Sequence, residues 1–537
     1  MSHKTVTNWT GRDDAMVEDA LRRGATRRDL LRLLMASGIG LAAGGTIIGR
    51  ASQAWADTPK SGGSITAAGW SASTADTLDP AKGSLSTDYV RACAFYNRLT
   101  FLEEGGSIRM ELADRLETKD AKTWTLTLRK GVTFHDGKPL TTDDVIYSLQ
   151  RHKDPAVGSK VNAMAKQMES FKKVDDGTME IVLAAPNADL PIILSLHHFM
   201  IIADGTTDFS TANGTGAFKC EVFEPGVRSV GVKNETYWKD KLPYLDSFEF
   251  IAISDEPARV NALLSGDIAL AASINPRSIR RLDTVSGVTL SKTTSGNYTD
   301  LNVRLDVDPG AKAGFVEGMK YLINREVIQR SVMRDLAVIA NDQPVSPNDR
   351  YYNKDLKPRE YDPEKAKSLF QKAGVLGRSI PIVASDAATS SIDMATVVQQ
   401  AGQEIGMPFD VQRVPSDGYW SNYWLKAPVH FGNINPRPTP DILFSLLYTS
   451  DAPWNESHYK SDKFDKMLVE ARGSLDEAKR KEIYDEMQVM ISEEAGTIIP
   501  VWISNVDALS SKLKGLKPNP LGGMMGYAFA EYVWLDA

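Results

Sequence analysis

Residues 126–145 read LTLRKGVTFHDGKPLTTDDV, and this stretch decides the fold. It begins inside an alternating run, residues 123–128, in which Trp and Leu share one face as in a half-buried β-strand. Asp136-Gly137 is typical of a tight turn. Thr141-Thr142 followed by Asp143-Asp144 predicts the capped start of a helix. The stretch therefore predicts a strand, a turn and a helix in close succession.

The rest of the chain mixes strands and helices without a regular repeat. Residues 178–183 and 216–223 alternate like strands, and the second turns back through Pro225-Gly226. Helices are predicted from the capping Asp362 to Gly374 and over about 476–494. Strands followed by helices, twice over, favour an α/β protein of two lobes. The chain of 537 residues also exceeds the roughly 250–300 residues at which a single core stops growing.

The composition excludes several classes of protein. With 42% hydrophobic and 24% charged residues, the chain is neither disordered, collagen-like nor a multispanning membrane protein. Residues 1–56 hold eight Lys and Arg against five Asp and Glu, which gives this segment a net charge of +3. Since the whole chain has a net charge of −7, the other residues carry −10. Such an acidic body is a poor partner for phosphate or anionic lipid. We therefore expect no binding to nucleic acid.

The basic leader, residues 1–56, has the parts of a secretory signal peptide. Arg27-Arg28 precedes an apolar run, and Ala54-Trp55-Ala56 has the form of a cleavage site. The apolar run is shorter than the roughly 20 residues that span a bilayer, although an uncleaved anchor remains the alternative. The arginine pair resembles a twin-arginine signal, which implies export of the folded chain by that translocase. We expect a mature chain that begins at Asp57 and resides in the periplasm.

The two cysteines leave two alternatives open. An oxidising compartment would allow a disulfide between Cys93 and Cys220. However, Cys220 alternates with Phe218 and Val222, which places it on a core face of a strand. This pattern favours two separate buried thiols.

The sequence lacks the patterns that mark catalytic and metal sites. A nucleophile elbow, a phosphate-binding loop, a dinucleotide fingerprint and zinc-ligand spacing are all absent. His197 and His198 are neighbours, and neighbouring side chains point in different directions, so they do not predict a metal site. We therefore expect no catalytic residue, no metal and no cofactor. These absences favour a binding protein over a secreted hydrolase, which would need a nucleophile with its base or a metal.

The stretch 126–145 resembles the signature of the extracellular solute-binding proteins of peptide-type ABC importers, the family 5 that includes dipeptide-, oligopeptide- and nickel-binding proteins. Further blocks resemble the landmarks of this family in the same order. They are residues 77–80, 112–114, 214–218, 234–238, 324–326, 361–366 and 499–502. The resemblance spans nearly all of the mature chain.

The resemblance implies a two-lobed periplasmic binding protein fold with mixed sheets and a discontinuous first lobe. Lobe I would comprise residues 57–307 plus 504–537, with an extra subdomain around 96–214, and lobe II residues 308–503. The chain would cross between the lobes near Asn302 and Trp502. A monomer would capture a peptide or peptide-like solute between its lobes and deliver it to permease and ATPase subunits of the inner membrane.

The residues that determine which ligand binds are expected in the loop at residues 430–441. Peptide-binding relatives hold the α-ammonium of the ligand with an aspartate that follows a Trp in this loop, but here Pro436 stands at that place. Arg437, stiffened by flanking prolines, would instead present its guanidinium to a carboxylate or phosphate. Asn433 and Asn435 belong to the same candidate site. The alternative is an Arg437 that lies on the surface or pairs with Asp441.

Two further segments are candidate walls of the cleft. Trp420 belongs to an aromatic cluster at residues 417–424, which helix packing would also explain. The segment after the first strand contributes Trp70, Ser71, Ser73 and Thr74, which turn formation would also explain. The alternative ligands within this fold are an anionic small molecule, a metallophore or haem.

Overall fold

The computed structural model describes residues 58–103, 106–519 and 522–536. The predicted signal residues Arg27 and Arg28 and the predicted cleavage residues Ala54 and Ala56 lie outside the described residues. Within the described part of the chain, no helix is long and apolar enough to cross a membrane.

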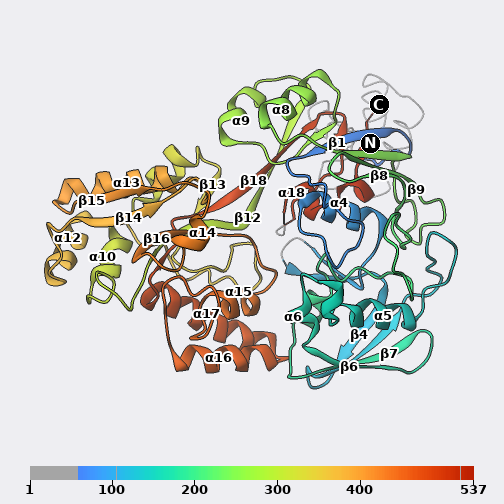
Figure 1. Ribbon diagram of the computed structural model, residues 1–537, viewed down its shortest axis with the longest axis horizontal. Coiled ribbons are helices and arrows are strands. Elements are labelled where there is room, and N and C mark those ends of the chain that lie inside the picture. The colour runs from blue at the N-terminus through green and yellow to red at the C-terminus, as the bar shows by residue number, and fades with distance from the viewer. Residues whose placement is uncertain (1–57, 104–105, 520–521, 537) are drawn as a thin grey trace, which may run out of the picture.

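A twelve-stranded sheet runs through the whole molecule (Figure 1). Its strands are, in spatial order, β15 (Phe409–Arg413), β14 (Ile380–Ala384), β16 (Val429–Ile434), β12 (Val288–Val303), β18 (Val501–Ser510), β11 (Leu270–Ala271), β1 (Ser64–Gly69), β10 (Ser247–Ala252), β9 (Arg228–Lys233) and β8 (Phe218–Glu224). Two short strands complete it, β13 (Ala337–Ile339) beside β18 and β17 (Thr497–Ile498) beside β12.

The molecule has two lobes, as the sequence predicts (Figure 1). The first lobe is built on β11, β1, β10, β9 and β8, and the second lobe on β15, β14 and β16. The sheet is mixed, because β1 pairs in parallel with β10 and β11 whereas β12 and β18 are antiparallel. The helices of the first lobe include α4 (Ser86–Phe95), α5 (Thr142–Arg151), α7 (Leu190–Ile193), α8 (Glu256–Ser265), α9 (Pro276–Leu282) and α18 (Gly523–Gly526). Those of the second lobe include α10 (Phe315–Leu322), α12 (Pro363–Lys372), α13 (Ser391–Ile405), α14 (Tyr419–Asn422), α15 (Pro440–Leu447), α16 (Asp462–Gly473) and α17 (Glu477–Glu494).

The stretch at 126–145 folds as its sequence predicts. It begins in β5 (Thr123–Leu128), turns at Gly137, whose φ is 89°, and enters α5. Thr141 caps this helix, and its backbone N–H donates to the Asp144 carboxylate at 2.8 Å. Strand β5 belongs to a separate four-stranded sheet with β4 (Ala113–Thr118), β7 (Thr178–Leu183) and β6 (Met168–Lys173). The helices predicted after Asp362 and over 476–494 are confirmed as α12 and α17.

Strands β12 and β18 form the connection between the lobes. They pair from Val288↔Ser510 to Asn297↔Ile503, with an irregularity between Thr294 and Asn297. Beyond this bulge β12 continues into the second lobe and pairs with β16. The Tyr298 and Trp502 rings pack edge-on at 5.4 Å just past the bulge. The paired strands β12 and β18 therefore connect the two lobes.

The two cysteines are both free thiols. Cys93 is buried in α4, as predicted, but Cys220 is only half-buried. Cys220 packs against the core of the first lobe, as its predicted face requires, but it stays partly exposed where the pairing of β8 with β9 shifts register between Cys220 and Val222. Such a bulge breaks the strict alternation of faces on which the prediction relied.

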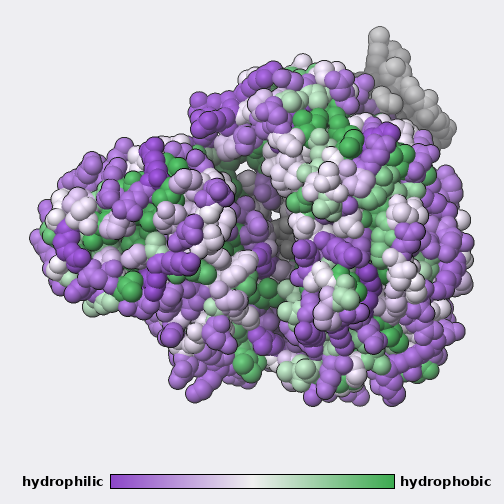
Figure 2. Space-filling view, in the orientation of Figure 1, coloured by the Kyte–Doolittle hydropathy of each residue, from purple (hydrophilic) through white to green (hydrophobic). Residues whose placement is uncertain are grey.

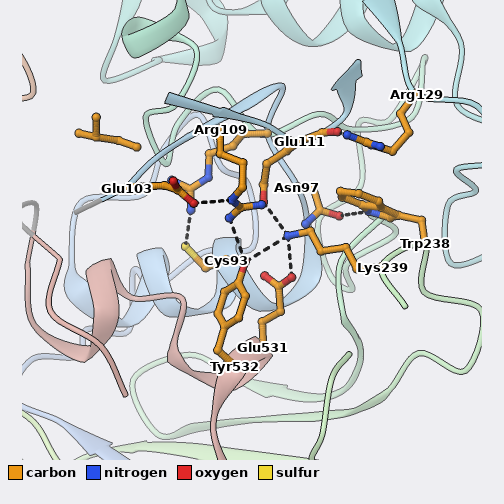
Figure 3. A network of polar contacts seen from close by, with 12 residues as sticks. Cys93, Asn97, Glu103, Arg109, Glu111, Arg129, Trp238, Lys239, Glu531 and Tyr532 are labelled. Carbon is orange, nitrogen blue, oxygen red and sulfur yellow. Dashed lines mark hydrogen bonds and ion pairs between the residues drawn. The ribbon is translucent and has the colours of Figure 1, made fainter. Parts of the chain in front are cut away.

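A buried charge network fastens the C-terminal segment to the first lobe (Figure 3). The Lys239 ammonium lies 2.6 Å from a carboxylate oxygen of Glu111 and 2.6 Å from one of Glu531. Arg109 adds an ion pair to Glu111 at 3.0 Å and donates to the Tyr532 hydroxyl at 3.1 Å. Burial alone would raise the pKa of Glu111, but Lys239 and Arg109 hold it below its usual value. The cluster therefore stays ionised, and each charge depends on its partners.

Replacing Lys239 by Met should destabilise the protein by about 3–5 kcal/mol, because Glu111 and Glu531 would keep buried charges with less compensation. Urea unfolding measures the loss. The matched control is Lys172→Met, which removes the exposed pair with Glu180 and should cost at most about 1 kcal/mol. Equal losses in the two variants would contradict a stabilising role for the network.

Candidate ligand-binding site

A pocket opens between the two lobes. The surface is deeply hollowed along their boundary (Figure 2). Three segments of the chain line the pocket beside the bulge of β12. The lining residues are Leu102 and Gly106 of the first lobe, Gly296 of β12, Pro344, Ser346, Asn348 and Asp349 after β13, and Pro436, Arg437, Pro438 and Leu443 around the loop after β16.

Gly296 lets the lining segments approach one another. A Cβ at this position would lie 3.3 Å from the Cβ of Ser346 and 3.4 Å from that of Pro436. Asn348 fastens its segment to the bulge, because its side-chain amide donates to the Thr294 carbonyl. The pocket is therefore built on the crossing between the lobes.

Arg437, predicted from the sequence as an anion-binding residue, lies in this pocket. Its Nη1 donates to the carbonyls of Asn435 at 2.9 Å and Pro436 at 3.2 Å, and its guanidinium stacks over Trp454. Burial lowers the pKa of Arg437. Among the residues that the structure describes, no carboxylate lies within ion-pair distance of it. The alternative pairing with Asp441 does not occur, because Asp441 binds Arg472 at 2.8 Å.

An aromatic cluster of the first lobe includes Tyr89, whose pKa the charge of Arg437 affects. The Tyr89 ring stacks on His197 at 5.0 Å and contacts His198 and Tyr527 at 5.5 and 5.4 Å. Burial raises the pKa of Tyr89, while the charge of Arg437 lowers it across the boundary. Burial lowers the pKa of His197 to about 3, so this imidazole is neutral at physiological pH. Tyr89 and His197 are therefore uncharged at physiological pH.

The other predicted residues of the second lobe lie outside the lining of this pocket. The Asn433 amide donates to the Tyr298 carbonyl at 3.2 Å and to the Thr299 hydroxyl at 3.0 Å, so it braces β16 against β12. Asn435 is exposed and supplies the carbonyl that Arg437 binds. Trp420 is 41% exposed, and its ring packs edge-on against Trp424 at 5.5 Å.

The predicted segment after β1 makes local contacts. Trp70 is half-buried against the core of the first lobe. The Ser71 hydroxyl lies 3.0 Å from that of Ser86, and the Ser73 hydroxyl accepts from the Ala75 N–H at 3.1 Å. Thr74 is exposed. A ligand contact for these residues stays a prediction.

The sequence analysis missed several residues that the structure brings to the pocket. Leu102, Asn348 and Asp349 line it, although they come from segments far apart in the chain. Their surrounding sequence has no recognisable motif. A metal site is not formed either: within the described ranges, no group of three His, Cys, Asp or Glu side chains could hold an ion.

The lobes also touch away from the crossing. Asp189, at the start of α7, pairs with Arg480 of α17 at 2.6 Å, and both side chains are almost fully buried. Next to this pair the Ala188 N–H donates to the Arg472 carbonyl at 2.9 Å. This contact closes the end of the boundary that lies opposite the crossing strands.

A pair of buried carboxyl groups supports the loop that carries Arg437. Asp300 of β12 lies opposite Gly432 of β16, and Glu456 reaches over the same glycine. A Cβ at position 432 would clash with both carboxyl groups, so only glycine leaves room for the pair. Burial raises the pKa of Asp300 to about 6, and burial together with Asp300 raises the pKa of Glu456 well above its usual value. This pair of carboxyl groups therefore contributes more to stability at low pH than at neutral pH.

Because both pKa values are raised on folding, the free energy of unfolding should fall as pH rises from about 4 through 6 and above. Asp300→Asn removes one of the two groups whose pKa is raised on folding. The loss of stability with rising pH should then be smaller than in the wild type, by about 1.4 kcal/mol for each unit by which folding raises the pKa of Asp300. Urea unfolding of both proteins at several pH values measures the difference. The exposed control Asp240→Asn should follow the wild type, and an Asp300→Asn profile identical to wild type would contradict the argument.

Known proteins resemble this chain over most of its length. It matches the family described as bacterial extracellular solute-binding proteins, family 5 Middle, over residues 107–456. It is 26% identical over 471 residues to the dipeptide-binding protein of Escherichia coli K12, covering 80% of this chain and 87% of that protein. It is also 26% identical over 470 residues to heme-binding protein A of Haemophilus influenzae, covering 80% and 85%.

Solved structures of similar proteins share the fold. The substrate-binding protein CtaP of Listeria monocytogenes superposes with a TM-score of 0.79 at 22% identity, covering 89% of this chain and all of that one. The periplasmic binding protein DppA of Helicobacter pylori, solved with the peptide STSA, gives 0.72 at 24% identity, covering 89% and 99%. From the family match, the chain belongs to the bacterial extracellular solute-binding proteins, family 5.

Proposed function

We propose that this protein is the substrate-binding subunit of an ABC importer and captures a peptide or peptide-like small solute between its lobes. The observation that carries the proposal is the pocket at the lobe boundary, which holds the Arg437 guanidinium without a protein carboxylate. The names of the relatives agree with it, since they bind dipeptides or haem. The closed protein would then deliver the solute to the permease and ATPase subunits.

Closure would be a rotation of one lobe against the other. We assign residues 57–307 plus 504–537 to lobe I, with a subdomain around 96–214, and residues 308–503 to lobe II. The bulge of β12 at Thr294–Asn297, opposite Ile503 of β18, is the place where the connecting strands can bend. A solute that contacts both walls binds the closed form better and therefore shifts the population toward it.

Arg437 would anchor an anionic group of the solute. Its flanking prolines fix the backbone, and Trp454 supports the guanidinium from one side. Binding of a carboxylate by two N–H groups would be charge-assisted and directional. The remaining predicted residues, Asn433, Asn435, Trp420, Trp70, Ser71, Ser73 and Thr74, would act at the rim of the cleft or support its walls.

The binding would be non-catalytic, by a monomer in the periplasm. The protein should retain its solute through purification under native conditions, and mass spectrometry would identify it. At a concentration about 100 times its dissociation constant, the solute should add roughly 2.7 kcal/mol to the free energy of unfolding. Small-angle scattering should show compaction at the same time. Release of a chemically altered solute would indicate an enzyme, and a bound haem would support the haem-binding alternative.

Export would use the twin-arginine pair of the leader. Replacing Arg27 and Arg28 by Lys should leave precursor in the cytoplasm, because that translocase reads the arginine pair. Fractionation followed by N-terminal sequencing measures both the location and the mature start, expected at Asp57. Normal export of the double variant would exclude this route.

A further inference from the structure

We infer that Asp189 and Arg480 form a latch between the lobes: these two positioning residues lie outside the solute pocket and hold the closed form, so they set how tightly the pocket retains its solute. The inference rests on the proposed function, because it concerns closure of the same two lobes. It assigns a role to a buried ion pair that stands apart from the lining of the pocket.

The two side chains of the latch come from opposite lobes. Asp189 precedes α7 in the first lobe, and Arg480 belongs to α17 of the second lobe, 291 residues further along the chain. Nη2 of Arg480 donates to Oδ1 of Asp189 at 2.6 Å. The two side chains are only 1% and 3% exposed, so water and salt screen this pair far less than a surface pair.

Each lobe presents its half of the latch in a fixed orientation. In the second lobe the Arg480 guanidinium stacks on the rings of Tyr351 and Tyr484, at 5.1 and 5.7 Å. In the first lobe the Asp189 N–H donates to the side-chain oxygen of Asn187 at 2.9 Å. Within the described part of the chain, neither Asp189 nor Arg480 makes a second ion pair. The charge of each lobe is therefore neutralised only by the other lobe.

The backbones of the two lobes also meet beside the latch. The Ala188 N–H donates to the Arg472 carbonyl at 2.9 Å, and a Cβ at Gly473 would lie 3.5 Å from the Cβ of Pro186. Helices α16 and α17 lie at the end of the boundary away from the crossing strands β12 and β18 (Figure 1). A rotation about the bulge of β12 would therefore separate the latch while the crossing stays connected.

The latch favours the closed form through the cost of buried charge. Opening exposes both groups to water, whereas closing pairs them directly. Removing one partner leaves the other charge buried and unpaired in the closed form alone, because the open form hydrates it. Burial alone would lower the pKa of Arg480, but Asp189 holds it above its usual value, so the charge persists on closing. Asp189→Asn should therefore lower the population of the closed form, and the apparent affinity for solute falls with it.

A disulfide placed beside the latch measures closure without any solute. The Cβ atoms at positions 186 and 473 lie at a separation that a disulfide spans, about 3.5–4.5 Å. The double variant Pro186→Cys, Gly473→Cys should crosslink under mild oxidation, at a rate that mass spectrometry measures, whereas each single variant should not. Adding Asp189→Asn should slow crosslinking about tenfold. The control Arg151→Met removes the 2.7 Å pair with Asp79 inside the first lobe and should leave the rate unchanged.

Solute retention provides a second readout, with a mixture of natural dipeptides as the probe. Calorimetry should show that Asp189→Asn and Arg480→Met each bind the mixture about ten- to a hundredfold more weakly than the wild type. The variant with both changes should bind no more weakly than either single variant, because it leaves no buried charge unpaired. Arg151→Met should bind as the wild type does. The oxidised disulfide variant, loaded with dipeptides, should release them at least tenfold more slowly than its reduced form.

An unchanged crosslinking rate on adding Asp189→Asn would overturn the inference. So would additive losses in the variant with both changes, an equal loss in Arg151→Met, or equal release from the oxidised and reduced disulfide variant. The disulfide variant keeps Asp189 and Arg480 intact, so the release measurement stands even where a latch variant fails to fold. Failure of the wild type to bind any dipeptide would instead count against the proposed function, while the crosslinking rate, which needs no solute, still decides on the latch.

Discussion

The pairing of β12 with β18 is the constraint on which the rest of the structure depends. These two antiparallel strands run through both lobes, and nearly every other strand of the large sheet is ordered outward from them. The pocket is built on the bulge where their pairing changes register, through Gly296 and the Asn348 contact to Thr294. A bend at the crossing would therefore move the two walls of the pocket directly.

The distribution of charge distinguishes the supporting structure from the site. In the first lobe Lys239, Glu111 and Glu531 neutralise one another, and at the lobe boundary Asp189 and Arg480 do the same. Inside the pocket the opposite holds, because no carboxylate of the described residues pairs with the Arg437 guanidinium, which binds only backbone carbonyls and stacks over Trp454. An unpaired buried charge is costly unless a ligand completes it, and this cost supports the proposal that the pocket binds an anionic group.

Local structure could be predicted from the sequence wherever neighbouring residues determine it. The alternation of 123–128 and the capping pattern at Thr141 gave the right strand and helix, and the ordered landmarks gave the right family. The partial exposure of Cys220 was not predicted because a bulge depends on the partner strand. Asp349 was missed because the pocket joins segments near positions 102, 349 and 437, which only the tertiary fold brings together. Arg437 was found because flanking prolines and a missing carboxylate marked its loop.

The proposed function requires that the lobes close on a solute with an anionic group against Arg437. A crystal structure of the protein purified under native conditions from its own host tests it most directly. The proposed function predicts density for a small solute between Leu102 and Arg437, with an anionic group on the guanidinium. A solute bound outside this pocket, or one with no anionic group on Arg437, would contradict it.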